Sequence, residues 1–114
     1  MIENGRANAA YKMCNEQRNS MREYRTRVKD LPSMIQVNGL APAIAFLYSK
    51  RRGAYRRLYS DIESWLISQN LIQANLMESL TRMDAMRYRQ VTVEVMALLG
   101  WMKRFVDGIE PDRG

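Results

Sequence analysis

The chain contains no histidine and only one cysteine, Cys14. Without histidine it lacks the commonest general base and the commonest metal ligand, and no Ser/His or Cys/His nucleophilic pair can form. A single cysteine excludes an intramolecular disulfide and a thiolate cage around a metal. The sequence also shows no glycine-rich phosphate-binding loop and no cluster of metal ligands. We therefore expect no metal, no cofactor and no enzyme activity, although carboxylates, Lys and Arg remain as catalytic groups.

Long apolar runs are absent as well. A transmembrane helix needs about 20 consecutive apolar residues, and the runs here are only a few residues long, so we expect no membrane partner. The N-terminus has no apolar stretch of the kind found in secretory signals, which favours a cytoplasmic location. The length of 114 residues, of which 46% are apolar, predicts a single folded domain over residues 1–114.

Proline and glycine are also scarce, with three and six copies. They fall between or at the ends of segments with helical apolar spacing, and no segment alternates long enough to predict a strand. The expected fold class is therefore all-α: a compact single-domain bundle of five to six helices with a long N-terminal helix. The helices are expected at residues 7–30, 40–51, 54–68, 73–83 and 85–107, with a short turn at 33–37.

Five residues are expected to punctuate these helices. Pro32 should stop the first helix, because the residue before a proline avoids the helical region. Asn38 and Asp84 should cap the N-termini of the second and the last helix. Gly53 should end the second helix, and Gly100, inside the last helix, should mark a tight helix crossing.

The expected first helix carries an apolar row with a period of seven. Ala7, Cys14, Met21 and Val28 lie on this row, so one face of the helix is expected to be buried, Cys14 included. At 1.5 Å per residue, a helix over 7–30 would be roughly 36 Å long. That length is large for so small a domain.

Basic residues outnumber acidic ones, 18 to 12, which gives a net charge of +6, and Arg supplies 14 of the 18. The surplus lies in the first half, because residues 61–114 hold six basic and eight acidic groups. Guanidinium groups bind two phosphate oxygens in one plane. The distribution favours an anionic polymer as partner, most simply a nucleic acid. The alternative is a basic surface that only solvates its charges.

Two groups of basic residues are the candidate phosphate contacts. The first is a basic rail on one face of the expected first helix, formed by Arg18, Arg22, Arg25 and Lys29 at i, i+4, i+7 and i+11. Like charges at this spacing repel one another, which favours external anions along the rail over a solvated basic face. The second is a cluster at a helix–helix turn, where helix N-terminal amides would add positive potential. Its residues are Lys50, Arg51, Arg52, Arg56 and Arg57.

Two tyrosines flank the second cluster. Tyr48 and Tyr55 are candidates for stacking on bases. Both also lie on the apolar stripes of their expected helices, and this position favours packing in the core over base stacking.

Several blocks of sequence resemble one known family. From Leu31 to Lys50 the chain reads Leu-Pro-Ser-Met-Ile-Gln-Val-Asn-Gly-Leu-Ala-Pro-Ala-Ile-Ala-Phe-Leu-Tyr-Ser-Lys. Further blocks follow at 59–66, at Tyr88-Arg89 with Thr92 and Glu94, and at 101–105. In this order and spacing, over roughly residues 24–106, the chain resembles the small α-helical subunit of the type III-B CRISPR effector, the Cmr complex.

The resemblance implies a non-catalytic scaffold subunit of a ribonucleoprotein. Such subunits stack with neighbouring copies of themselves as a short filament beside the repeated backbone subunit, within a complex that also contains a large subunit. The two rows enclose the duplex of CRISPR RNA and target RNA, and other subunits cleave. Basic family positions that match here are expected to face RNA or a neighbouring subunit. They are Lys29, Lys50, Arg89, Lys103 and Arg104.

Two other functions remain open from the sequence. One is a stand-alone helical module that binds nucleic acid outside any CRISPR complex. The other is a histidine-free nuclease that acts through Arg, Lys or carboxylates. The first would bind duplex DNA without partner subunits, and the second would cleave nucleic acid when purified.

Overall fold

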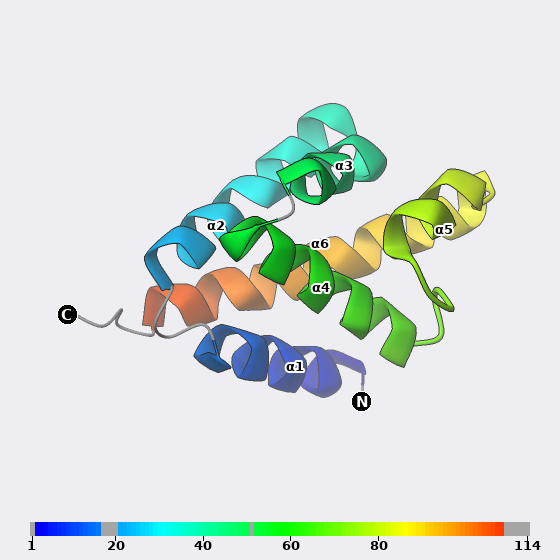
Figure 1. Cartoon of the computed structure of the whole chain (residues 1–114). Helices are drawn as coiled ribbons and strands as arrows, with labels where there is room; N and C mark the ends of the chain where they lie inside the picture. Colours follow the sequence, from blue (N-terminus) through cyan, green and yellow to red (C-terminus); the bar gives the residue numbers. More distant parts are fainter. Residues whose placement is uncertain (1, 17–20, 51, 109–114) are drawn as a thin grey trace.

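A computed structural model describes residues 2–16, 21–50 and 52–108 of the chain. These residues form six α-helices and no strand, which confirms the all-α prediction and the helix number. Figure 1 shows their arrangement. The helices are α1 (Ile2–Glu16), α2 (Met21–Asn38), α3 (Leu40–Lys50), α4 (Gly53–Ser68), α5 (Leu76–Arg82) and α6 (Ala85–Gly108).

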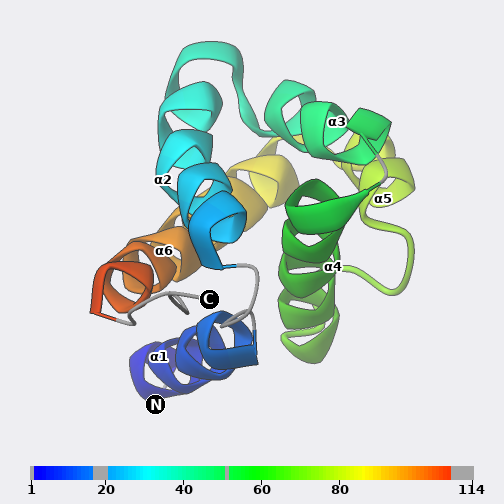
Figure 2. The same ribbon diagram turned by 60° about the vertical axis from the view of Figure 1, so that its left-hand side comes forward.

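The longest of these helices, α6, forms the centre of the bundle. It contacts α1, α2 and α4, while α3 packs on α2 and α4, and α5 packs on α3 (Figures 1 and 2). From Val91 to Val106, the side of α6 that faces these helices is apolar and buried, with a buried apolar residue every three or four positions. These residues are Val91, Val95, Leu98, Leu99, Met102 and Val106.

The prediction of one long N-terminal helix is wrong. Helix α1 ends at Glu16 and α2 begins at Met21, and both pack on α6 as separate helices (Figure 2). The predicted row is nevertheless buried in each of them, at Cys14 in α1 and at Val28 in α2. A period of seven reports which face is buried, but it carries no signal for a break between two helices that bury the same face.

The expected stop at Pro32 is also wrong, because α2 continues through the proline and includes the predicted turn at 33–37. Proline removes one backbone donor and strains one helical turn, whereas Leu31 and Ile35 on either side of it are buried in the core. Asn38 is the last residue of α2 rather than a cap of α3. The helix ends at Gly39, whose φ is 92° and whose N–H donates to the Ile35 carbonyl at 2.8 Å.

The predicted cap of α6 is confirmed, whereas the observed starts of α4 and α5 differ from the predictions. Asp84 Oδ1 accepts the Arg87 backbone N–H at 2.8 Å, which confirms Asp84 as the cap of α6. Gly53 begins α4 instead of ending α3, with a φ of 52°. Helix α5 begins at Leu76, three residues later than predicted, because Asn75 caps it by accepting the Glu78 N–H at 3.0 Å.

A charged cluster attaches α1 to the rest of the bundle. Arg6 on α1 donates to both carboxylate oxygens of Glu94 on α6, at 2.7 and 2.8 Å, and Trp65 on α4 donates to the same carboxylate at 2.8 Å. The Arg6 hydrogen bond, opposed in part by burial, holds the pKa of Glu94 below its usual range. Paired charges of this bidentate kind are stronger than ordinary surface pairs. The cluster therefore joins three helices through one carboxylate.

Gly100 does not mark a helix crossing, contrary to the sequence prediction. It is exposed on α6, and a Cβ added to it meets nothing within 4 Å.

We predict that Gly100→Ala raises the free energy of unfolding by roughly 0.5–1 kcal/mol, since it removes only the entropic cost of glycine in a helix. Denaturant titration followed by circular dichroism measures this. The matched control, Gly39→Ala, should instead destabilise the fold by about 1–3 kcal/mol, because its φ is positive. Equal effects of the two changes would contradict the assignment.

A buried carboxylate makes stability depend on pH. Asp61 on α4 is 9% exposed and accepts the Tyr24 hydroxyl at 2.5 Å. Burial raises the pKa of Asp61 to about 6, opposed by Tyr24 and Arg57 and supported by Glu16. The fold therefore favours the protonated form, and the contribution of Asp61 to stability falls as the pH rises from about 4 to about 6.

We predict that Asp61→Asn melts at a higher temperature than the wild type at pH 7, by a margin that grows as the pH rises from 4 to 6. Asparagine keeps an acceptor for Tyr24 without the buried charge, and the shift of about two units corresponds to roughly 3 kcal/mol at most. Thermal melts across this pH range measure it. Asp30→Asn removes one acid at an exposed position of α2, where it pairs with Arg27, and this control should not show the growing margin. A margin between Asp61→Asn and the wild type that stays constant over this interval would contradict the prediction.

Candidate nucleic-acid interface

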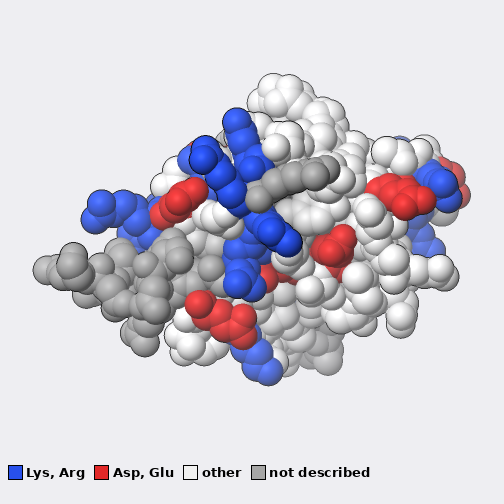
Figure 3. All heavy atoms as spheres, viewed as in Figure 1, with Lys and Arg blue, Asp and Glu red and all other residues white. Residues whose placement is uncertain are grey.

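Exposed basic side chains gather where the N-terminal halves of α2 and α4 lie side by side. Figure 3 shows this concentration of positive charge over the junction of the two helices. We call it the basic face. Its exposed members come from α2, the end of α3 and the start of α4, so the fold joins the two groups that the sequence singled out. They are Arg22, Lys50, Arg52, Arg56 and Arg57.

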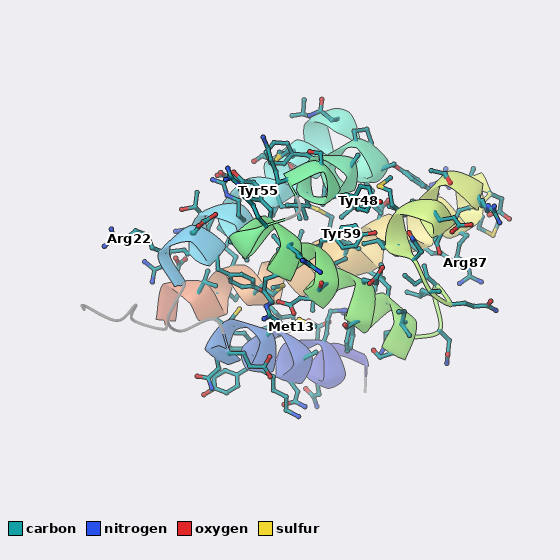
Figure 4. All side chains as sticks on the ribbon, viewed as in Figure 1. Met13, Arg22, Tyr48, Tyr55, Tyr59 and Arg87 are labelled. Atoms are coloured by element: carbon teal, nitrogen blue, oxygen red, sulfur yellow. The ribbon has the colours of Figure 1, made fainter. Side chains whose placement is uncertain are left out.

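The described residues of the basic rail on α2 differ in their surroundings. Arg22 is exposed and projects away from the body of the protein (Figure 4). Arg25 Nε donates to the Val106 carbonyl at 3.0 Å, and Lys29 Nζ pairs with Asp107 Oδ1 at 2.8 Å. These two cations thus face the C-terminal turn of α6, where positive charge complements the helix dipole. Arg18 lies outside the described residues.

The cluster between α3 and α4 is more open to solvent than the rail. Arg52, Arg56 and Arg57 are exposed, and no ion pair forms with them among the residues that the structure describes. Lys50 lies over the Phe46 ring, with 5.4 Å between its Nζ and the ring centroid. Arg51 lies outside the described residues. An anion that approached this cluster would therefore meet guanidinium groups without an ion pair to break.

One acid belongs to the same region and changes the role of the α4 N-terminus. A Cβ placed on Gly53 would lie 3.5 Å from Glu23 Oε1, so the Glu23 carboxylate sits beside the first residue of α4. A carboxylate there complements the positive end of the helix dipole. The positive end of α4 thus has an acid from α2 beside it, and the exposed arginine side chains supply the positive potential of the basic face.

Arg27 is a residue of this region that the sequence analysis missed. Its Nη1 donates to the Tyr55 hydroxyl at 2.8 Å, its guanidinium lies 5.0 Å from the centroid of that ring, and its Nη2 pairs with Asp30 at 3.3 Å. Arg27 thereby fixes α2 against the first turn of α4. The contact spans 28 positions of the chain, so helix periodicity gives no signal for it.

The two tyrosines near the cluster differ from each other. Tyr55 is half-buried and packs edge-on against Phe46, with 5.6 Å between the ring centroids, as the preference for core packing predicts. Tyr48 is 40% exposed, so for this residue the prediction is wrong. Its ring lies 5.5 Å from that of Tyr59, and Figure 4 shows the two rings side by side between α3 and α4. Together with Leu47, Arg56 and Ser60 they line a hollow of about 430 Å³.

The other basic residues implied by the family resemblance lie on α6. Arg89 is near its start, beside a shallow hollow that Tyr88 and Val93 also line. Lys103 and Arg104 lie about 20 Å further along the helix, where the Arg104 guanidinium covers the Trp101 ring at 5.0 Å. The structure therefore does not bring Arg89 together with Lys103 and Arg104.

Within the described residues, no three His, Cys, Asp or Glu side chains lie close enough to hold a metal ion. None of the described helices combines the length and the apolar character needed to cross a membrane. Burial raises the pKa of the Cys14 thiol to about 12, and Cys14 Sγ donates to the Met102 carbonyl at 3.6 Å. The thiol is thus a buried packing group, as its position on the apolar row predicts.

Comparisons with known proteins give one consistent match. The profile of a family described as CRISPR-associated protein (Cas_Cmr5) matches residues 2–109. The CRISPR system Cmr subunit Cmr5 of Thermus thermophilus is 31% identical over 87 residues, which cover 76% of this chain and 75% of that protein. The crystal structure of a CRISPR-associated Cmr5 family protein from the same organism superposes with a TM-score of 0.82. It is 26% identical to this chain, and the match covers 96% of both chains.

Proposed function

Since the chain belongs to the Cas_Cmr5 family of CRISPR-associated proteins, we propose that it is a non-catalytic, RNA-binding scaffold subunit of a type III-B Cmr complex. The basic face between α2 and α4 is the observation that carries this proposal. In the complex this face lies along the backbone of the guide RNA–target RNA duplex. Neighbouring copies stack as a short filament beside the repeated backbone subunit and the large subunit, in the cytoplasm.

Backbone binding suits the chemistry of the basic face. Its exposed arginines present planar forks that bind phosphate oxygens in pairs. Phosphate contacts position a nucleic acid but do not read its sequence. Contacts to the backbone are sufficient in a guided complex, because base pairing with the guide recognises the target sequence and the protein recognises only backbone and shape. The face therefore contributes affinity and register, and cleavage belongs to other subunits.

A stand-alone nucleic-acid-binding module is the second candidate. The basic face alone would serve it equally well, since phosphate affinity requires no partner protein. Membership of the Cas_Cmr5 family, with a match to residues 2–109, favours the complex. The two differ in whether other Cmr subunits are needed for tight binding.

We predict that Arg22→Gln combined with Arg56→Gln weakens target RNA capture by the assembled complex. Each lost phosphate contact should reduce the slope of log affinity against log salt by roughly 0.7–0.9. For each copy of the subunit that contacts the RNA, the double variant should therefore lower the slope by about 1.5. The loss of affinity should be largest at low salt. Capture of labelled target RNA across a salt series measures both quantities.

A matched control removes the same charge at the other end of the molecule. Arg82→Gln combined with Arg87→Gln changes two exposed arginines at the α5–α6 corner, and Figure 4 shows Arg87 far from Arg22. This variant should capture RNA like the wild type. Equal losses in both variants would show a general charge effect and contradict the assignment of the face. Submicromolar binding of duplex DNA by the chain alone would favour the stand-alone module.

A further inference from the structure

The hollow between α3 and α4 adjoins the basic face and has a different chemistry. Arg56 belongs to both, whereas the other lining residues are Leu47, Tyr48, Tyr59 and Ser60. A volume of about 430 Å³ lies within the range of roughly 300–1,000 Å³ that small-molecule sites occupy. The hollow thus combines aromatic rings, an apolar wall, a hydroxyl and one cation at the rim of a phosphate-binding surface.

The two rings of the hollow are held in place from different sides. The Tyr59 hydroxyl accepts the backbone N–H of Met77 at 3.0 Å, which fixes this ring against the start of α5. Burial raises the pKa of the Tyr59 phenol, so the ring stays neutral beside a polyanion. Tyr48 lies against it, with 44° between the ring planes, and exposes 40% of its surface. The hollow therefore places a partly exposed tyrosine ring beside a fixed one.

We propose that this hollow binds one unpaired nucleobase of an RNA strand whose backbone lies on the basic face. The proposal rests on the proposed function, because the basic face brings the strand to the hollow. Unstacked RNA bases are commonly recognised by stacking on tyrosine rings and arginine planes. Arg56 binds the phosphate next to the unpaired nucleotide, while its base stacks against Tyr48 and contacts Leu47.

The positive charge at the rim of the hollow favours a nucleotide over an apolar protein side chain as its occupant. The rim carries Arg56, with Arg52 one helical turn before it, and both are exposed without an ion pair among the described residues. A nucleotide brings a phosphate for the guanidinium and a flat ring for the tyrosine in one unit. An aliphatic side chain would fill the hollow but leave the adjacent charge uncompensated.

Stacking also predicts what the hollow does not do. Every base has a π-face, so base–aromatic stacking tolerates all four bases. The hollow should therefore sense whether a base is unpaired, and not which base it is. That property adds to backbone binding without competing with guide pairing for sequence recognition.

The test compares three short RNA duplexes with the full chain at low salt, by fluorescence anisotropy. One is fully paired, one carries a single bulged uridine, and one carries an abasic site in place of that uridine. The wild type should prefer the bulged duplex to the abasic one by roughly 5- to 150-fold, the range that stacking of one base on an aromatic ring provides. Binding of the paired duplex reports the basic face alone.

The variants separate the hollow from the basic face. Tyr48→Ala should abolish the preference and still bind the paired duplex, whereas Tyr48→Phe keeps both. Ser60→Phe fills the hollow from α4 without removing Tyr48 and should also abolish the preference. Tyr11→Ala is the matched control, since Tyr11 is 50% exposed on α1 and pairs with Phe105; it should retain the preference.

The outcomes are distinct. If the wild type binds the paired and abasic duplexes as tightly as the bulged one, the base site is wrong while the basic face stands. A preference that survives both Tyr48→Ala and Ser60→Phe also overturns the site. If Tyr48→Ala binds all RNAs normally but no longer joins the Cmr complex, the hollow holds a protein side chain instead. If the wild-type chain alone binds none of the duplexes, the base site is wrong for the isolated chain, whereas the proposed function is tested separately by RNA capture in the assembled complex.

Discussion

The buried apolar side of α6 is the constraint on which the rest of the structure depends. It must be covered from Val91 to Val106, and α1, α2 and α4 cover it together. Since α2 and α4 then pack side by side, their N-terminal halves meet at one surface (Figures 1 and 2). The basic face is thus a consequence of how the core is closed. Burial of apolar area does not by itself orient the helices, because it is non-directional. The charged contacts described above determine which helix ends lie next to each other.

The basic residues divide into those that hold helices together and those that are exposed on the basic face. Arg6 joins three helices through Glu94, Arg27 joins α2 to α4 through Tyr55, and Arg25 and Lys29 hold α2 to the end of α6. Arg56, exposed on α4, forms no ion pair within the described residues, whereas Arg57 also acts electrostatically on the buried Asp61. Replacement of the first kind is expected to change stability, and replacement of the second to change binding. Net charge alone does not distinguish them.

Sequence periodicity predicted which residues are buried better than it predicted where helices begin and end. The helical apolar spacing that predicts helices at 54–68 and 85–107 and the cap at Asp84 are local signals, and the structure confirms them. The break between α1 and α2 was missed because both helices bury the same face of the apolar row. The passage of α2 through Pro32 was missed because burial of Leu31 and Ile35 outweighs the local cost of the proline. The link between Arg27 and Tyr55 was missed because it depends on how distant helices pack. For the same reason the sequence named the members of the basic face but not the hollow beside it.

The face and the hollow together assign two kinds of contact to one small surface. Phosphate contacts are long-ranged and depend on salt, whereas stacking acts at contact distance and is less sensitive to salt. Raising the salt concentration should therefore weaken binding of the paired duplex more than it weakens the preference for an unpaired base. Because Arg56 lies in both, its loss should reduce both, while loss of Tyr48 should reduce only the second. This asymmetry follows from the position of one guanidinium between a helix surface and an aromatic pair, and it distinguishes a two-part RNA site from a surface that is merely basic.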